Sequence, residues 1–147
     1  MSLRERLNEE MKAAMKAKDD LRLSAIRMIR SSVKNKEIDQ KREMDDQGVV
    51  EVVSTLVKQR RESLKMFSDA GRDDLVAKEE KELGVLLEFL PRQLTAEELV
   101  EIVDRVIAET LAQGPKDMGK VMKVLQPMVS GRADGKAVSE LVRQKLA

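Results

Sequence analysis

The chain has 147 residues, enough for one domain or two small ones, and its 28 basic side chains nearly balance 27 acidic ones. That balance argues against a protein that binds polyanions without regard to sequence, and we expect no DNA binding, although local basic patches can still matter. The chain contains no His, Cys, Trp or Tyr, which excludes disulfides and zinc sites and removes the usual general base. With no signal peptide and no apolar run of membrane-spanning length, we expect a cytoplasmic protein that contacts no membrane and holds no metal or cofactor.

Helical periodicity starts at the first residues. Ser2 and Glu5 have the spacing of a capping box, and apolar residues follow every three or four positions as far as Met15. Asp19-Asp20 predicts the start of a second helix, whose apolar face consists of Ala25, Ile26, Ile29 and Val33. The polar stretch from about 35 to 48 predicts a fraying helix end and a loop.

A long third helix is expected over about 46–70. Its apolar positions keep the helical period although the valine-rich part, 49–57, would also suit a strand: Val49, Val53, Leu56, Val57, Leu64 and Phe67. Gly71 predicts the end of this helix, and Asp73 is expected to cap a fourth helix that stops at Pro91.

The remaining third of the chain repeats these signals on a smaller scale. Thr95 and Glu98 form a second capping box that opens a helix to about residue 112. A short helix from Asp117 should end at Pro127, and a last helix should follow Asp134. No segment shows strand alternation. The sequence therefore predicts an all-α, multihelical protein with two helical subdomains, four helices in residues 1–91 and three in residues 92–147.

Two short motifs resemble catalytic signatures but lack their companions. Ser31 and Lys34 have the spacing of some serine acyltransferases. The turn at 131–136 is one residue short of a phosphate-binding loop, and Ala137 replaces the Ser or Thr that would hold magnesium. We therefore predict no catalytic residues. The turn is either purely structural or a place where backbone amides before a helix meet a phosphate.

Basic residues gather in particular places. Arg27, Arg30 and Lys34 share one face of the second helix, and Lys58, Arg61 and Lys65 repeat that spacing on the third. Residues 91–112 carry two basic and five acidic residues, whereas residues 113–147 carry seven basic and three acidic ones. Such faces are either solvated surface or binding surfaces for phosphates. The candidate RNA-binding residues in the last part are Lys120, Lys123, Arg132 and Lys136.

The two aromatic residues, Phe67 and Phe89, are too few to stack single-stranded bases, so RNA contacts should go to phosphates and shape. Arg60 stands apart from the basic faces because it lies within the apolar arc of the third helix. We expect it to form a structural ion pair with Glu79 or Glu80.

Several segments resemble known proteins. Residues 58–63 (KQRRES), 70–72 (AGR) and 88–94 (EFLPRQL) resemble the stand-alone YqeY-like proteins of bacteria. Residues 118–122 (MGKVM) and 131–136 (GRADGK) resemble the GatB/YqeY motif, which also forms the C-terminal tail of the B subunit of the aminoacyl-tRNA amidotransferase. The resemblance covers essentially the whole chain and implies an all-helical fold in two subdomains.

The resemblance also implies a direction for function. In the amidotransferase the tail domain helps to recognise tRNA, while the transamidation chemistry resides in other domains. A related module is appended to a glutaminyl-tRNA synthetase. A member of this family can carry the label of a carbon–nitrogen ligase with glutamine as amido donor, inherited from the amidotransferase. Nothing in this chain is suited to activate a carboxyl group, so the label would not describe an activity of its own. We expect a non-catalytic accessory module that binds tRNA or a tRNA-handling enzyme. The alternative is a protein–protein adaptor without RNA contact.

Overall fold

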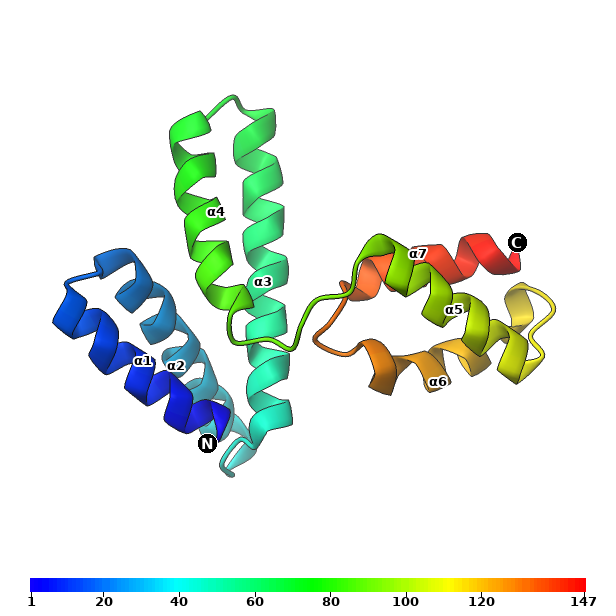
Figure 1. The fold of residues 1–147 in the computed structure, drawn as a ribbon, viewed down its shortest axis with the longest axis horizontal. Helices are drawn as coiled ribbons and strands as arrows, with labels where there is room; N and C mark the ends of the chain where they lie inside the picture. The colour runs from blue at the N-terminus through cyan, green and yellow to red at the C-terminus, as the bar shows by residue number, and fades with distance from the viewer. The chain divides into compact units, whose positions relative to one another are not determined.

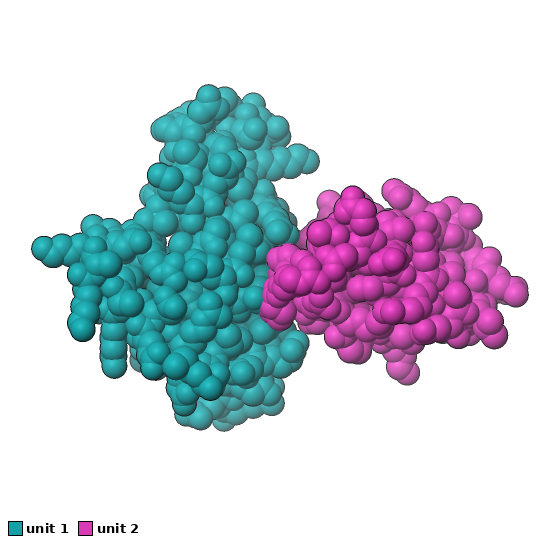
Figure 2. Space-filling model, in the orientation of Figure 1, with its two compact units in different colours: residues 1–90 teal, residues 91–147 magenta.

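A computed structural model describes residues 1–147 and contains seven α-helices, one short 3₁₀ turn and no strand (Figure 1). The predicted all-α class is confirmed. The chain divides into two compact units, unit 1 from Met1 to Leu90 and unit 2 from Pro91 to Ala147 (Figure 2). None of the helices combines the length and apolar character needed to cross a bilayer.

Unit 1 consists of two helical hairpins. One is formed by α1 and α2, the other by α3 and α4, and α2 packs against both helices of the second hairpin (Figure 1). The bounds are α1 Leu3–Ala17, α2 Asp20–Gln40, α3 Asp46–Asp69 and α4 Asp73–Leu87. The core is continuous across all four helices because each one contributes an apolar stripe. Its most deeply buried side chains are Ile26, Ile29, Val49, Val53, Leu86 and Phe89.

Short side chains at the helix starts satisfy the first backbone amides. The Ser2 hydroxyl accepts a hydrogen bond from the Glu5 amide at 3.1 Å, and the Glu5 carboxylate accepts one from the Ser2 amide at 3.2 Å, which completes the predicted capping box. Asp45 caps α3 by accepting from the Gly48 amide at 2.8 Å. Asp73 does not cap α4 as predicted. It is the first residue inside that helix, where its negative charge interacts favourably with the positive end of the helix dipole.

The second helix is longer than predicted. It continues through the polar segment to Gln40 and ends at Lys41, which adopts a left-handed conformation with φ of 54°. Glu37 explains the extension, because its carboxylate pairs with Arg4 on α1 and accepts a hydrogen bond from the Met44 amide at 2.8 Å. The last turns of α2 are thus held by contacts with two other segments rather than by apolar periodicity.

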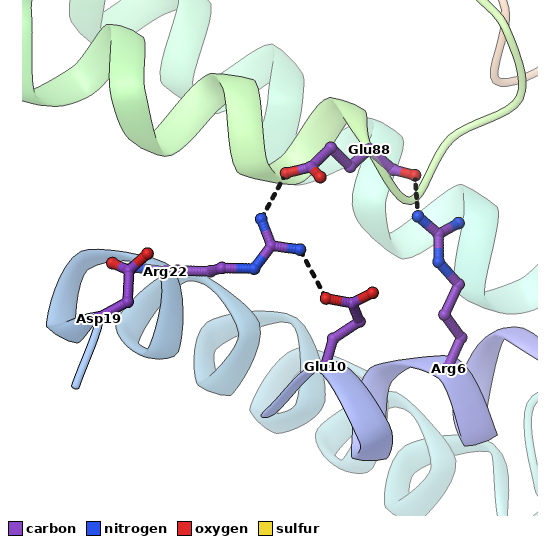
Figure 3. A network of polar contacts seen from close by, with 5 residues as sticks. All are labelled: Arg6, Glu10, Asp19, Arg22 and Glu88. Atoms are coloured by element: carbon purple, nitrogen blue, oxygen red, sulfur yellow. Dashed lines mark hydrogen bonds and ion pairs between the residues drawn. The ribbon is translucent and has the colours of Figure 1, made fainter. Parts of the chain in front are cut away.

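A polar network holds the end of α4 against the first hairpin (Figure 3). Arg22 on α2 donates to the Glu10 carboxylate on α1 and to the Glu88 carboxylate just after α4, both at 2.7 Å. Arg6 donates to the Glu88 carbonyl oxygen at 2.8 Å, and its guanidinium lies 4.8 Å from the centre of the Phe89 ring. Hydrogen bonds to Glu88 and then Glu10 raise the pKa of Arg22 above its usual value, so this residue stays a cation.

Unit 2 is a smaller three-helix arrangement. Its elements are α5 Ala96–Thr110, the 3₁₀ turn η1 Pro115–Asp117, α6 Met118–Val129 and α7 Gly135–Leu146. Five of its core side chains are essentially inaccessible to solvent: Val103, Val106, Val121, Leu125 and Val142. The segment before α5 is fixed to the turn between α6 and α7, because the Leu94 amide donates to the Arg132 carbonyl at 2.8 Å. The Gln93 side chain also donates to the Gly131 carbonyl at 2.7 Å.

The sixth helix does not end at Pro127 as predicted. It continues to Val129, with Pro127 inside its last turn. A proline removes one backbone donor and crowds the carbonyl four residues earlier. Here the loss falls next to the helix end, and the Ser130 amide still donates to the Gln126 carbonyl at 3.0 Å. Val129 is buried in the core, so packing favours the additional residues.

Candidate functional site

The predicted RNA-binding lysines of unit 2 are exposed. Lys120 and Lys123 project from α6, three residues apart and therefore on one face, and Lys136 lies in the first turn of α7. None of the three has an ion pair or a side-chain hydrogen bond. Lys145, in contrast, is paired with Asp104 at 3.1 Å. Lys120, Lys123 and Lys136 therefore have no counter-charge within the protein, and their charges are available to a partner.

Arg132, the fourth predicted RNA-binding residue, is placed differently. It is half-buried in the turn between α6 and α7, and its Nε donates to the Arg92 carbonyl at 3.2 Å. Together with the bond from the Leu94 amide to the Arg132 carbonyl, this contact fastens the segment before α5 to the turn between α6 and α7. Arg132 thus has a structural role that the sequence pattern did not reveal.

The turn before α7 is less open to a phosphate than the sequence indicated. Asp134 caps the helix, and its carboxylate accepts a hydrogen bond from the Ala137 amide at 3.3 Å. A negative charge therefore already lies at the amides where we expected an anion. This geometry favours the structural interpretation of the turn over the phosphate-binding one.

The basic face of α2 lines a groove. Arg27, Arg30 and Lys34 are exposed along one side of a cavity of about 470 Å³ in unit 1, and Arg4 of α1 lies on the lining as well. The apolar side chains in the lining are buried core residues: Leu7, Val33 and Val49. The helical spacing of the three α2 cations predicted their common face. The contribution of Arg4 was missed, since nothing in the sequence shows that α1 lies beside that face.

The second basic face has no such setting. Lys58, Arg61 and Lys65 are exposed on α3, outside this groove, and they form no ion pair. They repeat the spacing and charge of the α2 face. The two triplets have the same spacing and the same charge, and they differ in what surrounds them.

The ion pair predicted for Arg60 is confirmed for Glu79. The Arg60 Nη1 atom lies 2.9 and 2.8 Å from the two carboxylate oxygens of Glu79, and 2.5 Å from Oε2 of Glu82. The side chains of Arg60, Glu79 and Glu82 are 17%, 13% and 9% exposed, whereas Glu80 faces solvent. The Glu82 oxygen is close enough for an ion pair but lacks the geometry of a hydrogen bond. Glu82 was not predicted, although it lies three residues from Glu79 and so on the same helix face.

Residues 4–146 match the sequence model of the YqeY-like protein family. The chain belongs to the YqeY-like family. This membership agrees with the segments that resemble YqeY-like proteins.

Among curated YqeY relatives, a protein of Eremothecium gossypii named "Altered inheritance of mitochondria protein 41, mitochondrial" is 36% identical over 96% of this chain and 79% of its own length. Proteins of the same name from Lachancea thermotolerans and Saccharomyces cerevisiae are 40% and 37% identical over 63% of this chain. The matched part spans about half the length of these two relatives.

The names of these YqeY relatives contradict one prediction. Each is named as a mitochondrial protein, so the expectation of a cytoplasmic location is wrong. That expectation rested on the lack of a signal peptide and of a long apolar segment, and neither absence separates the cytoplasm from mitochondria, whose targeting segments are amphipathic. The names state no binding partner and no reaction.

Proposed function

We propose that this YqeY-like protein is a non-catalytic accessory module that binds tRNA through unit 2. The observation that carries the proposal is the set of three exposed lysines with no ion-pair partner, Lys120, Lys123 and Lys136. They lie in a segment, 113–147, where seven basic residues outnumber three acidic ones. The relation of the GatB/YqeY motif to a tRNA-recognising tail domain identifies tRNA as the RNA to test.

The chemistry of unit 2 suits phosphates rather than bases. Both phenylalanines of the chain, Phe67 and Phe89, belong to unit 1, so unit 2 has no aromatic side chain on which a base can stack. Lysine ammonium groups act as point charges and neutralise phosphates without regard to base identity. Binding should therefore respond strongly to salt and discriminate weakly among RNA sequences.

The decisive experiment replaces Lys120, Lys123 and Lys136 together by Ala and measures tRNA affinity at two or more salt concentrations. Arg132 is left in place, because it holds the turn between α6 and α7. Each lost phosphate contact should reduce the slope of log affinity against log salt by about 0.7 to 0.9, so the slope should fall by up to about 2 to 3.

The matched control replaces Lys58, Arg61 and Lys65 by Ala, which removes the same charge from α3 of unit 1. It should retain the wild-type slope. Equal affinity of the unit 2 variant and wild type would disprove this site. If the wild type binds no tRNA even at low salt, the adaptor without RNA contact becomes the better explanation. A pull-down with and without nuclease would then show whether a tRNA-handling enzyme is held directly.

A further inference from the structure

The groove between α1 and α2 is distinguished by an accumulation of unbalanced positive charge. Four cations line it, Arg4, Arg27, Arg30 and Lys34, against one carboxylate, Glu37. Glu37 pairs with Arg4 and also accepts from the Met44 amide, so its charge is committed at one end of the groove. The net charge of the lining is therefore +3, and it comes from the three cations of α2.

These three cations lack the partners that usually occupy surface arginines and lysines. Arg27 and Lys34 form no ion pair and no side-chain hydrogen bond. The only polar contact of Arg30 is a 2.9 Å hydrogen bond to the sulfur of Met11. Like charges held on one helix face at this spacing repel one another modestly. An anion in the groove would relieve that repulsion and use hydrogen-bond donors that the protein leaves free.

The size and lining of the groove indicate what kind of anion it would take. A volume of about 470 Å³ lies within the range of small-molecule sites. Two guanidinium groups offer paired N–H donors that match a phosphate, and Asn8 and Ser31 add neutral polar groups. Leu7, Val33 and Val49 belong to the buried core and form the apolar part of the lining, against which a carbon skeleton can pack.

We propose that this groove binds a small organic phosphate, a phosphate monoester with a short aliphatic body. A dianionic phosphate balances more of the +3 charge than a single carboxylate does, and the apolar lining favours an ester over the bare ion. No aromatic side chain lines the groove to offer a stacking surface for a nucleobase, so a short aliphatic body fits the lining better. The site lies in unit 1 and does not depend on tRNA binding by unit 2.

The test is a titration of the full chain with n-butyl phosphate, followed by NMR signals of the Leu7 and Val33 methyl groups. Inorganic phosphate and pentanoate serve as separate arms. We expect saturable shifts of both methyl groups with n-butyl phosphate, at least about tenfold weaker binding of inorganic phosphate, and weaker binding still of pentanoate. Equal binding of pentanoate would overturn the choice of a phosphate. Absence of saturation below about 10 mM n-butyl phosphate would overturn the site.

Matched variants separate this groove from general electrostatics. Replacing Arg27, Arg30 and Lys34 by Gln should abolish saturation with n-butyl phosphate. Replacing the α3 triplet, Lys58, Arg61 and Lys65, by Gln should change the affinity for n-butyl phosphate by less than about twofold. The single variant Arg27→Gln guards against misfolding, since Arg27 makes no polar contact that the fold can lose, and it should weaken binding about tenfold. Equal losses in the α2 and α3 triple variants would contradict the proposal.

Discussion

Replacing Arg60 by Ala should lower the free energy of unfolding of unit 1 by about 3 kcal/mol. Arg60 is the only cation within 4.0 Å of Glu79 or Glu82, and the side chains of these two residues are 13% and 9% exposed. Its removal leaves two poorly hydrated carboxylates beside each other without a counter-charge. Breaking a buried pair typically costs about 3 to 5 kcal/mol. The lower end applies because the Arg60 side chain is itself 17% exposed and its charge is partly solvated.

Two further variants separate charge from packing. Arg60→Met keeps most of the side-chain stem near Met28, whose sulfur lies 3.4 Å from Arg60 Nη2. This variant should still lower the free energy of unfolding by about 2 kcal/mol, because it removes the charge. Adding Glu82→Gln to Arg60→Ala should restore about 1 kcal/mol, because it removes one of the two uncompensated charges. Arg61→Ala is the control: this neighbour is exposed and unpaired, and its effect should stay within about 0.5 kcal/mol.

Urea unfolding followed by far-UV circular dichroism is the suitable assay, since the chain has no Trp or Tyr for fluorescence. Because the chain has two compact units, the methyl signals of Ile26 should be followed in parallel, as this residue is fully buried in unit 1. A change below about 0.5 kcal/mol for Arg60→Ala, or an Arg60→Met variant as stable as the wild type, would refute the reasoning from an uncompensated charge.

Three other perturbations have definite expected outcomes. Leu111→Gly should stabilise unit 2 by about 1 kcal/mol in thermal unfolding, because Leu111 ends α5 with φ of 58° and its side chain, 77% exposed, has little packing to lose. Hydrogen bonds from Arg92 and the Thr95 backbone lower the pKa of Glu98 from 4.5 to about 2. Ionised Glu98 therefore stabilises unit 2 above about pH 4.5 and this contribution is lost as the pH falls toward 2; an NMR titration should show that midpoint, and Arg92→Ala should raise it. Arg22→Gln should destabilise unit 1 by about 1 kcal/mol at low salt and by less at high salt, because the ion pairs to Glu10 and Glu88 are partly exposed.

Helix starts were predictable from the sequence because their signals are local. The Ser2–Glu5 and Thr95–Glu98 pairs form complete capping boxes in the structure, and each needs only residues three positions apart. Helix ends were predicted less well. The end of α2 depends on contacts that Glu37 makes with distant residues, and the proline in α6 is tolerated because the core continues to Val129.

The candidate sites show the same limit. A helical wheel gives the triplets on α2 and α3 equal weight, since it records which side chains share a face and nothing about neighbouring helices. Only the tertiary structure shows that α1 adds Arg4 and closes a groove over one of them. Likewise, the wheel placed Arg60 in an apolar arc and so predicted a carboxylate partner. The choice of Glu79 and Glu82 over Glu80 required the register between α3 and α4.

The two proposed binding surfaces present positive charge in different settings, one on exposed helices of unit 2 and the other in a cavity of unit 1. Because of this difference, their ligands should respond differently to salt and to mutation. Lys120, Lys123 and Lys136 are exposed on helices of unit 2 and suit a large polyanion that stays hydrated. The cations on α2 line a cavity whose lining also includes three apolar side chains, where a bound phosphate loses part of its water and meets donors at short range. Binding in the groove should therefore weaken less with salt than binding of tRNA. If n-butyl phosphate does not displace tRNA and each triple variant affects only its own ligand, the surfaces are independent. Competition between the two ligands would instead show that the groove forms part of the RNA-binding surface, which would contradict the assignment of RNA binding to unit 2 alone.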